Sequence, residues 1–258
     1  MKRLPLLLVG LALATTACEG RDKAPGASPL TIAAAADLRF ALEELGPAFE
    51  KAHPQSRVTV SYGSSGNFYA QLLNGAPFDL FLSADVSYPR QLVDRGVAEA
   101  DSEFTYAVGR IVLWAPGASA LPVETMGLKV LEDPRAARIA IANPQHAPYG
   151  RAAEAAMRAA GILDGVRGKL VYGENVAQTL QFVESGSADL GIVALSLAKR
   201  VAGRSFLIPA EMHPAIEQGG AVLKGALHAD AARTFRAFMM SSEGRAVLAR
   251  YGLSPPEG

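Results

Sequence analysis

Two adjacent serines, Ser64 and Ser65, stand in a short stretch whose residue types suit the binding of a small anion. This stretch, residues 60–71, has the pattern of an apolar strand, a turn of small residues and the start of a helix. Gly63 and Gly66 allow the backbone to turn tightly and let a ligand approach closely. The N-terminus of a helix presents unpaired N–H groups and a partial positive charge, so it attracts anions. Two hydroxyls beside such N–H groups would suit an oxyanion, although a Gly-Ser run is also typical of an ordinary loop.

The same serines raise the question of enzymatic chemistry. A phosphate-binding P-loop requires Gly-Lys-Ser/Thr, and no such sequence follows Gly66. A nucleophile elbow requires Gly-x-Ser-x-Gly, whereas residues 63–66 are Gly-Ser-Ser-Gly. A secreted serine hydrolase that uses Ser64 or Ser65 with His146 is a remote alternative, since His146 lies beside another candidate turn. We expect His146 mainly to fix that turn. We expect no catalytic residues and no enzyme activity.

The combination of a strand, a short turn and a helix start recurs at three other places. They are Ala36-Asp37, residues 147–150 and Asn175-Val176. These corners contain no lysine or arginine, and the nearby Arg39 and Arg151 are expected mainly as solvated charges on exposed helical faces. If two halves of the chain face each other, the four turns can converge on one ligand. This predicts an anion held by neutral donors, which must be numerous and fixed because desolvating a doubly charged ion is costly.

The composition limits the classes of protein to which the chain can belong. It has 258 residues with 25 Lys+Arg and 25 Asp+Glu, and this balance argues against nucleic-acid binding. An anion must therefore be attracted by a local site rather than by overall charge. The single cysteine excludes an intramolecular disulfide and a cysteine-based zinc site, and the four histidines show no ligand spacing. We expect no directly coordinated metal cation and no cofactor.

The N-terminal residues have the pattern of an export signal. A short charged start precedes an apolar stretch of signal length, so residues 1–17 are expected to be a signal peptide. Cys18 resembles the acylated cysteine of bacterial lipoproteins, although Thr15 replaces the usual leucine, and the alternative is ordinary cleavage after Ala17. Residues 18–29 are expected to form a flexible tether. The predicted location is the periplasm or cell envelope, as a membrane-anchored lipoprotein.

The remaining chain alternates apolar strand segments with amphipathic helical segments. This pattern predicts βαβ units and an α/β fold with mostly parallel sheets flanked by helices. Strands are expected at 30–36, 57–62, 78–83, 138–142, 169–172 and 188–194. Two β-like runs, 104–114 and 215–223, are expected to connect two lobes. The predicted boundaries are 30–108 and 222–258 for lobe 1, and 109–221 for lobe 2. Ligands of such sheets bind at the carboxyl ends of strands, where the four turns lie.

Several sequence blocks resemble bacterial periplasmic molybdate-binding proteins, the substrate-binding components of ABC importers. These blocks are residues 34–38, 62–66, Gln71, 74–85, 143–150, 190–193 and 250–252. The Asn-Gly-Ala-Pro block at 74–85 and the Asn-Pro-Gln block at 143–150 are fairly specific together. The resemblance implies a two-lobed periplasmic-binding-protein fold of type II with two hinge strands. It also implies a monomer that closes on molybdate or tungstate and delivers it to an inner-membrane ABC permease.

The resemblance further implies which residues contact the oxyanion. The principal set is Ala36, Asp37, Ser65, Tyr149 and Val176. Ala36 and Val176 would bind through their backbone N–H groups, Ser65 would add its hydroxyl, and Tyr149 would act through its N–H. Secondary candidates are Ser64, Pro148, Asn175 and Ala194.

Two residues depart from the pattern of the resembling family. Asp37 stands where its members often carry Ser or Thr-Asn, and an ionised carboxylate would repel a dianion. Asp37 could cap its own helix, become protonated when the ligand binds, or indicate a different ligand; the cap is favoured because Asp is a strong N-cap residue. Ala194 stands where many members place a tyrosine, which the hydroxyl of Tyr149 could replace. A receptor for sulfate, phosphate or another small anion is the alternative with the same fold.

Overall fold

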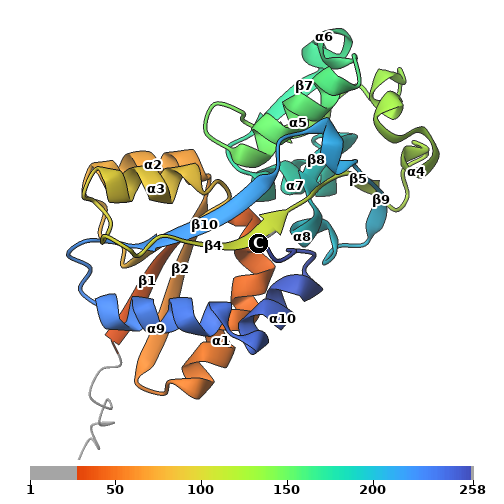
Figure 1. Cartoon of the computed structure of the whole chain (residues 1–258). Coiled ribbons are helices and arrows are strands. Elements are labelled where there is room, and N and C mark those ends of the chain that lie inside the picture. The colour runs from red at the N-terminus through yellow and green to blue at the C-terminus, as the bar shows by residue number, and fades with distance from the viewer. Residues whose placement is uncertain (1–27, 257–258) are drawn as a thin grey trace, which may run out of the picture.

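The computed structural model describes residues 28–256 and consists of two lobes, each built on a five-stranded sheet (Figure 1). The predicted signal peptide, Cys18 and most of the predicted tether lie outside the described residues. Within the described part, no helix is both long enough and apolar enough to cross a bilayer.

The first sheet has the strand order β2-β1-β3-β10-β4. Its strands are β1 (Ser28–Ala35), β2 (Ser56–Gly63), β3 (Leu80–Ser83), β4 (Phe104–Gly109) and β10 (Ile216–Val222). β1 is parallel to β2 and β3, whereas β10 is antiparallel to β3 and β4. The mixed sheet is covered on both faces, and this explains why β1 and β3 are nearly continuous apolar runs.

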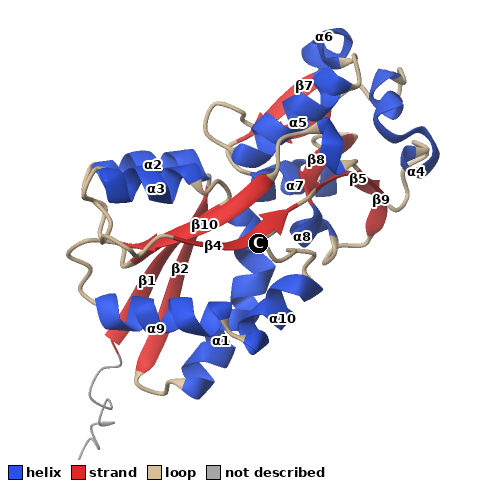
Figure 2. Cartoon of the chain, viewed as in Figure 1, coloured by secondary structure: helices blue, strands red, loops and turns tan. Residues whose placement is uncertain are grey.

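Helices cover the two faces of the first sheet unequally (Figure 2). The helices of this lobe are α1 (Arg39–Ala52), α2 (Ser65–Leu73), α3 (Ser87–Asp94), α9 (Ala229–Met240) and α10 (Ser242–Arg250). Ile32 packs in one core with Phe49 of α1 and Phe235 of α9, whereas Ala33 packs in another with Phe68 of α2 and Leu92 of α3. Successive residues of β1 therefore serve opposite faces, as the pleat of a strand requires.

The second sheet has the strand order β7-β6-β8-β5-β9. Its strands are β5 (Ile111–Pro116), β6 (Ile139–Ala142), β7 (Leu170–Gly173), β8 (Leu190–Ala194) and β9 (Gly203–Leu207). Its helices are α4 (Val123–Met126), α5 (Pro148–Ala159), α6 (Leu163–Val166), α7 (Val176–Glu184) and α8 (Leu195–Ala198). Short 3-10 turns complete the chain: η1 (Ala36–Leu38), η2 (Gly127–Glu132), η3 (Arg167–Lys169) and η4 (Ala210–Met212). β6 is parallel to β7 and β8, and β5 is antiparallel to β8 and β9.

The chain crosses between the sheets differently from the prediction. The run 104–114 is not one strand but two, because β4 ends at Gly109 and β5 begins at Ile111 in the other sheet. The run 215–223 forms β10, which pairs along its length with strands of the first sheet. The predicted boundary between lobe 2 and lobe 1 at residue 222 is therefore wrong, because it assigned most of β10 to lobe 2. Figure 1 shows β4 and β10 side by side where they approach the second lobe. The second crossing therefore precedes Ile216.

Candidate functional site

The four predicted turns meet at one small cavity between the lobes, with a volume of about 10 Å³. From the first lobe it is lined by Ala35, Ala36, Asp37, Gly63, Ser64, Ser65 and Ala84. From the second lobe it is lined by Ala147, Pro148, Tyr149, Asn175 and Val176. The structure thus brings together all five principal candidates and three of the four secondary ones. Ala194 does not line this cavity; it lies buried at the end of β8.

Helices α2, α5 and α7 all begin at this cavity and direct N–H groups toward it. The first i→i−4 hydrogen bonds are donated by the N–H groups of Phe68, Arg151 and Thr179. Of the N–H groups that precede them, that of Gly150 donates to the carbonyl of Ala147, and the others have no backbone acceptor in their own helix. Some are satisfied elsewhere: the N–H of Gly66 donates to the carbonyl of His146, and those of Ala177 and Gln178 donate to Oδ1 of Asn175. The N–H groups of Ser65, Tyr149 and Val176 remain at the cavity and can donate to an anion.

Two serine hydroxyls add donors from the first lobe. Oγ of Ser65 accepts a 2.9 Å hydrogen bond from the N–H of Ala84, so its own proton can be donated to a ligand. Ser64 occupies the N-cap position of α2, but its hydroxyl makes no cap bond. Its Oγ is instead buried without a hydrogen-bond partner in the described structure. A buried hydroxyl of this kind requires an explanation, and a ligand at the cavity supplies one.

Asp37 does not cap its own helix, and the favoured prediction is wrong on this point. The residue lies inside the η1 turn rather than before it, and it is only 1% exposed. Its Oδ2 accepts hydrogen bonds of 2.9 Å from the hydroxyl of Tyr149 and 2.6 Å from Nε2 of Gln218. Burial raises the pKa of Asp37 to about 6, against the opposing effect of these two hydrogen bonds. Its Oδ1 is buried without a partner in the described structure.

The hydroxyl of Tyr149 is therefore engaged with Asp37 and does not replace the tyrosine absent at Ala194. Burial, and next the charge of Asp37, raise the pKa of Tyr149 well above its ordinary value, so the hydroxyl stays protonated and acts as the donor. Gln218 also donates to this hydroxyl over 2.9 Å. Gly109 leaves room for the group, because a Cβ there would overlap the Tyr149 hydroxyl and the Gln218 amide.

Gln218 was not among the predicted site residues. It lies on β10 and is fully buried, and the register of β10 against β4 shifts between Gln218 and Gly219. Such a bulge changes the direction in which a side chain points. The available signal was a single amide within the apolar and glycine-rich strand Ile216–Val222. That signal indicates a buried polar residue but not its partners.

Further contacts hold the two lobes together around the cavity. The N–H of Gly66 donates to the carbonyl of His146 over 2.9 Å, and Nδ2 of Asn67 donates to Oε1 of Glu174 over 3.2 Å. Oγ of Ser196 on α8 donates to the backbone carbonyl of Asp37 over 2.8 Å. These residues come from both lobes, so the structure represents a closed arrangement.

Arg151 also joins the lobes, contrary to its prediction as a solvated charge. Its Nη2 lies 2.5 Å from Oδ2 of Asp85, and Nη1 donates to the hydroxyl of Tyr88 over 3.3 Å. Arg39, in contrast, forms an exposed i,i+4 pair with Glu43, as a solvated helical face would. Neither arginine lines the small cavity, so the described lining of this cavity contains no cation.

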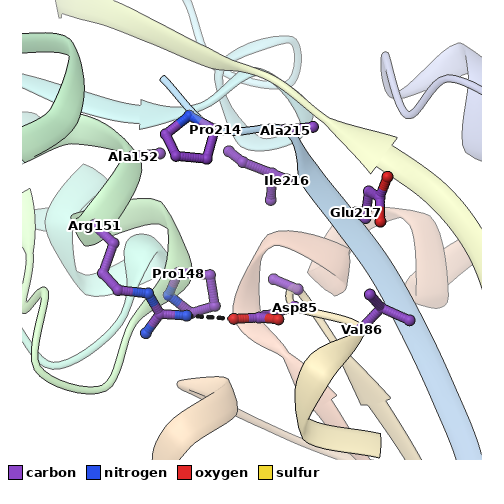
Figure 3. A pocket seen from close by; sticks show the side chains of 10 residues that line it. Asp85, Val86, Pro148, Arg151, Ala152, Pro214, Ala215, Ile216 and Glu217 are labelled. Atoms are coloured by element: carbon purple, nitrogen blue, oxygen red, sulfur yellow. Dashed lines mark hydrogen bonds and ion pairs between the residues drawn. The ribbon is translucent and has the colours of Figure 1, made fainter. Parts of the chain in front are cut away.

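A larger cavity of about 330 Å³ lies beside the small one and shares Ala84 and Pro148 with it (Figure 3). Figure 3 shows the Arg151 side chain directed at Asp85. Glu217 of β10 lies on the side of the space opposite Arg151. The ion pair already neutralises the arginine. Val86 at the start of α3 and Pro148 at the start of α5 line the space, but the N–H of Val86 donates to the carbonyl of Glu217 and proline has no N–H. The small cavity is therefore the better anion site despite its size.

His146, the histidine considered for catalysis, makes a hydrogen-bond contact with the backbone. Nε2 of His146 lies 3.0 Å from the carbonyl of Glu174, and this contact links two turns of the second lobe. Among the described residues, no hydrogen bond joins the His146 ring to Ser64 or Ser65.

Comparison with known proteins agrees with this architecture. The family model described as bacterial extracellular solute-binding protein matches residues 30–254. The molybdate-binding protein ModA of Rhodobacter capsulatus is 35% identical over 247 residues, covering 95% of this chain and 92% of the relative. The solved periplasmic molybdate-binding protein of Azotobacter vinelandii is similar with a TM-score of 0.83 and 34% identity, covering 88% of this chain and 100% of that chain. A putative ABC transporter substrate-binding lipoprotein, YvgL of Bacillus subtilis, is 33% identical over 229 residues, which are 87% of this chain and 86% of the relative.

The two lobes and the closed cleft between them define a solute-binding protein with the periplasmic-binding-protein fold. Within that class, the chain belongs to the ModA family of bacterial extracellular solute-binding proteins. Membership places it among binding proteins rather than enzymes, so the serine hydrolase alternative is set aside.

Proposed function

We propose that this protein captures molybdate in the small interlobe cavity and delivers it to an ABC permease in the membrane. One observation carries the proposal: helix N-termini from both lobes and two serine hydroxyls from the first lobe converge on a small space whose described lining has no cation. Neutral donors fixed by the fold suit a small, fully dehydrated oxyanion. The similarity to ModA proteins of Rhodobacter capsulatus and Azotobacter vinelandii favours molybdate among the tetrahedral oxyanions.

In the proposed complex, Ala36, Asp37, Ser65, Tyr149 and Val176 surround the oxyanion. Ser65, Tyr149 and Val176 donate from the starts of their helices, and the hydroxyl of Ser65 adds a further hydrogen bond. Ser64 joins them through a hydroxyl that has no other partner in the described structure. Tungstate has the same charge and shape, so we expect it to bind in the same way.

Ligand binding would favour the closed arrangement, because the donors from the two lobes reach one anion only when the lobes meet. The closed form would then dock on the permease. We also propose that Cys18 carries a lipid anchor, an expectation supported by the name of the similar protein YvgL, a putative lipoprotein. Mass spectrometry of the mature N-terminus tests this, and an unmodified Cys18 would contradict it.

Calorimetric titration of the protein with molybdate, tungstate, sulfate and phosphate tests the proposed ligand. We expect tight binding of molybdate and tungstate and weak binding of sulfate, which is a smaller ion. Ser65→Ala should weaken molybdate binding, whereas Ser187→Ala, at an exposed position of the second lobe, should not. Sulfate binding without a response to molybdate would favour the alternative receptor.

A further inference from the structure

In the proposed complex, the buried carboxyl group of Asp37 lies close to a doubly charged anion. Asp37 lines the cavity, and it is the only acidic residue among the described lining residues. Desolvation of a dianion beside a buried carboxylate is unfavourable, because both charges are negative and neither is screened by water. The side chain cannot turn away, since the hydrogen bonds from Tyr149 and Gln218 fix Oδ2.

The groups around Asp37 do not supply a compensating positive charge. Tyr149 of α5 and Gln218 of β10 donate to Oδ2, and both donors are neutral. Tyr106 of β4 faces Asp37 as a neutral phenol, because burial and then the charge of Asp37 raise its pKa well above the ordinary value. Arg39, two residues along the chain, pairs with an exposed glutamate instead. Within the described structure, no lysine, arginine or histidine forms an ion pair or hydrogen bond with Asp37.

The two carboxyl oxygens have different environments. Oδ2 accepts two hydrogen bonds, whereas Oδ1 is buried and has no partner in the described structure. A buried acceptor without a donor is costly, and an ionised one is costlier. A proton on Oδ1 would remove the charge and convert this oxygen into a donor at the cavity. Oδ2 would keep both of its hydrogen bonds.

We propose that Asp37 is a specificity-determining residue that binds the oxyanion as a neutral carboxylic acid, with Oδ1–H donating to a ligand oxygen, so that each dianion is captured together with one proton. The proton comes from solvent and forms the O–H bond on Oδ1; no bond of the ligand breaks. This inference rests on the proposed function, because it concerns the same cavity. It adds that the site selects a dianion plus a proton rather than the dianion alone.

Linkage then determines how binding depends on pH. Burial raises the pKa of Asp37 to about 6, so the carboxyl is mostly ionised at pH 8 before molybdate binds. If only the protonated form binds, the Kd for molybdate rises about tenfold between pH 7 and pH 8. Nearly one proton is taken up per molybdate at pH 8, and little uptake occurs at pH 5, where the group already carries its proton.

Calorimetry of the full chain with sodium molybdate at pH 8, in two buffers of different ionisation enthalpy, measures this uptake directly. Asp37→Asn is the neutral isostere: we expect no uptake, equal Kd at pH 7 and pH 8, and tighter binding than the unaltered protein at pH 8. His146→Gln changes another titratable side chain near the cleft, and the proton uptake should persist in this variant. A difference infrared spectrum of the unaltered protein should show a carboxylic-acid carbonyl band appearing with molybdate, which does not depend on any variant folding.

The outcomes separate this inference from the proposed function. Binding of molybdate at pH 8 without proton uptake overturns the inference and leaves the proposed function intact. Uptake that persists in Asp37→Asn, or uptake without a carboxylic-acid band, also overturns it. If no oxyanion binds at any pH, the proposed function fails and the inference fails with it.

Discussion

The hydroxyl of Tyr149, on the second lobe, donates a 2.9 Å hydrogen bond to Oδ2 of Asp37, on the first lobe. Both side chains are buried, and the amide of Gln218 on β10 contacts both. Asp37 therefore lines the binding cavity, takes part in the contact between the lobes, and is hydrogen-bonded to β10, the strand that follows the second crossing between the lobes. Changes to this group should affect ligand affinity, closure and pH dependence together.

Replacement of Tyr149 by phenylalanine removes this hydrogen bond but keeps the backbone N–H at the cavity. Asp37 is neutral in the proposed complex, and a hydrogen bond between neutral groups contributes about 0.5–1.5 kcal/mol, so we expect Kd for molybdate at pH 5, where the carboxyl already carries its proton, to rise by roughly two- to tenfold. The pKa of Asp37 should also rise further, because the Tyr149 hydrogen bond lowers it. Calorimetry measures the affinity, with Tyr172→Phe at a partly exposed position of β7 as the control. An unchanged Kd would show that the hydroxyl contributes nothing to closure.

Replacement of Asp37 by asparagine should stabilise the unliganded protein at neutral and alkaline pH. Burial raises the pKa from 3.8 to about 6 in the folded state, so the folded state binds more protons than the unfolded state between these values. The contribution of Asp37 to the unfolding free energy is thus fully present below pH 3.8 and is lost as the pH rises through about 6. The difference between the two pKa values, 3.8 and about 6, corresponds to about 3 kcal/mol of unfolding free energy. Urea unfolding at pH 4 and pH 8 should show Asp37→Asn more stable at pH 8 only; equal stability at both would contradict burial as the cause.

The ion pair between Arg151 and Asp85 should slow the opening of the cleft. Its side chains are 40% and 27% exposed, so solvent screens the pair and its contribution is at most about 1 kcal/mol. We expect Arg151→Ala to raise the dissociation rate of molybdate by up to about fivefold, with a smaller effect on association. Stopped-flow displacement measures both rates. Arg135→Ala, which breaks an exposed pair with Asp133 inside the second lobe, is the matched control and should leave them unchanged.

Gly66 offers a way to hinder closure without changing either lobe. A Cβ at this position would overlap the backbone of His146 across the cleft. We expect Gly66→Ala to keep its melting temperature but to bind molybdate at least tenfold more weakly, and X-ray scattering should show a larger radius of gyration with ligand present. Gly117→Ala is the control, since a Cβ there meets no atom within 4 Å. Normal affinity in Gly66→Ala would mean that the lobes can bind the ligand at a greater separation.

The four turns of the site could be predicted because each is defined locally. A strand, a Gly, Ser, Asn or Asp in the corner and a helical segment follow one another within about ten residues, and parallel sheets place such corners at one edge. Asn175 illustrates this, because its side chain caps α7 as its residue type predicts.

The role of Asp37 could not be predicted in the same way, because its partners are distant in sequence. Tyr149 lies 112 residues away and Gln218 lies 181 residues away. Local propensity favours Asp as a cap, but tertiary contacts override that propensity where a buried donor pair is available. The division of 104–114 at Arg110 was missed for a related reason: both halves are β-like, and only the pairing partners reveal that they belong to different sheets.

The position of β10 has a consequence for how the chain acquires its structure. Residues Ile216–Val222 fill the gap between β3 and β4, so the first sheet stays divided until a late segment of the polypeptide arrives. The second sheet, in contrast, is made from the uninterrupted stretch 111–207 and needs nothing that comes later. During synthesis the N-terminal residues emerge first, so the first lobe begins to form before the second lobe but is completed after it. Until then β3 exposes an unpaired edge, and this interval is when the nascent molecule is most prone to aggregate.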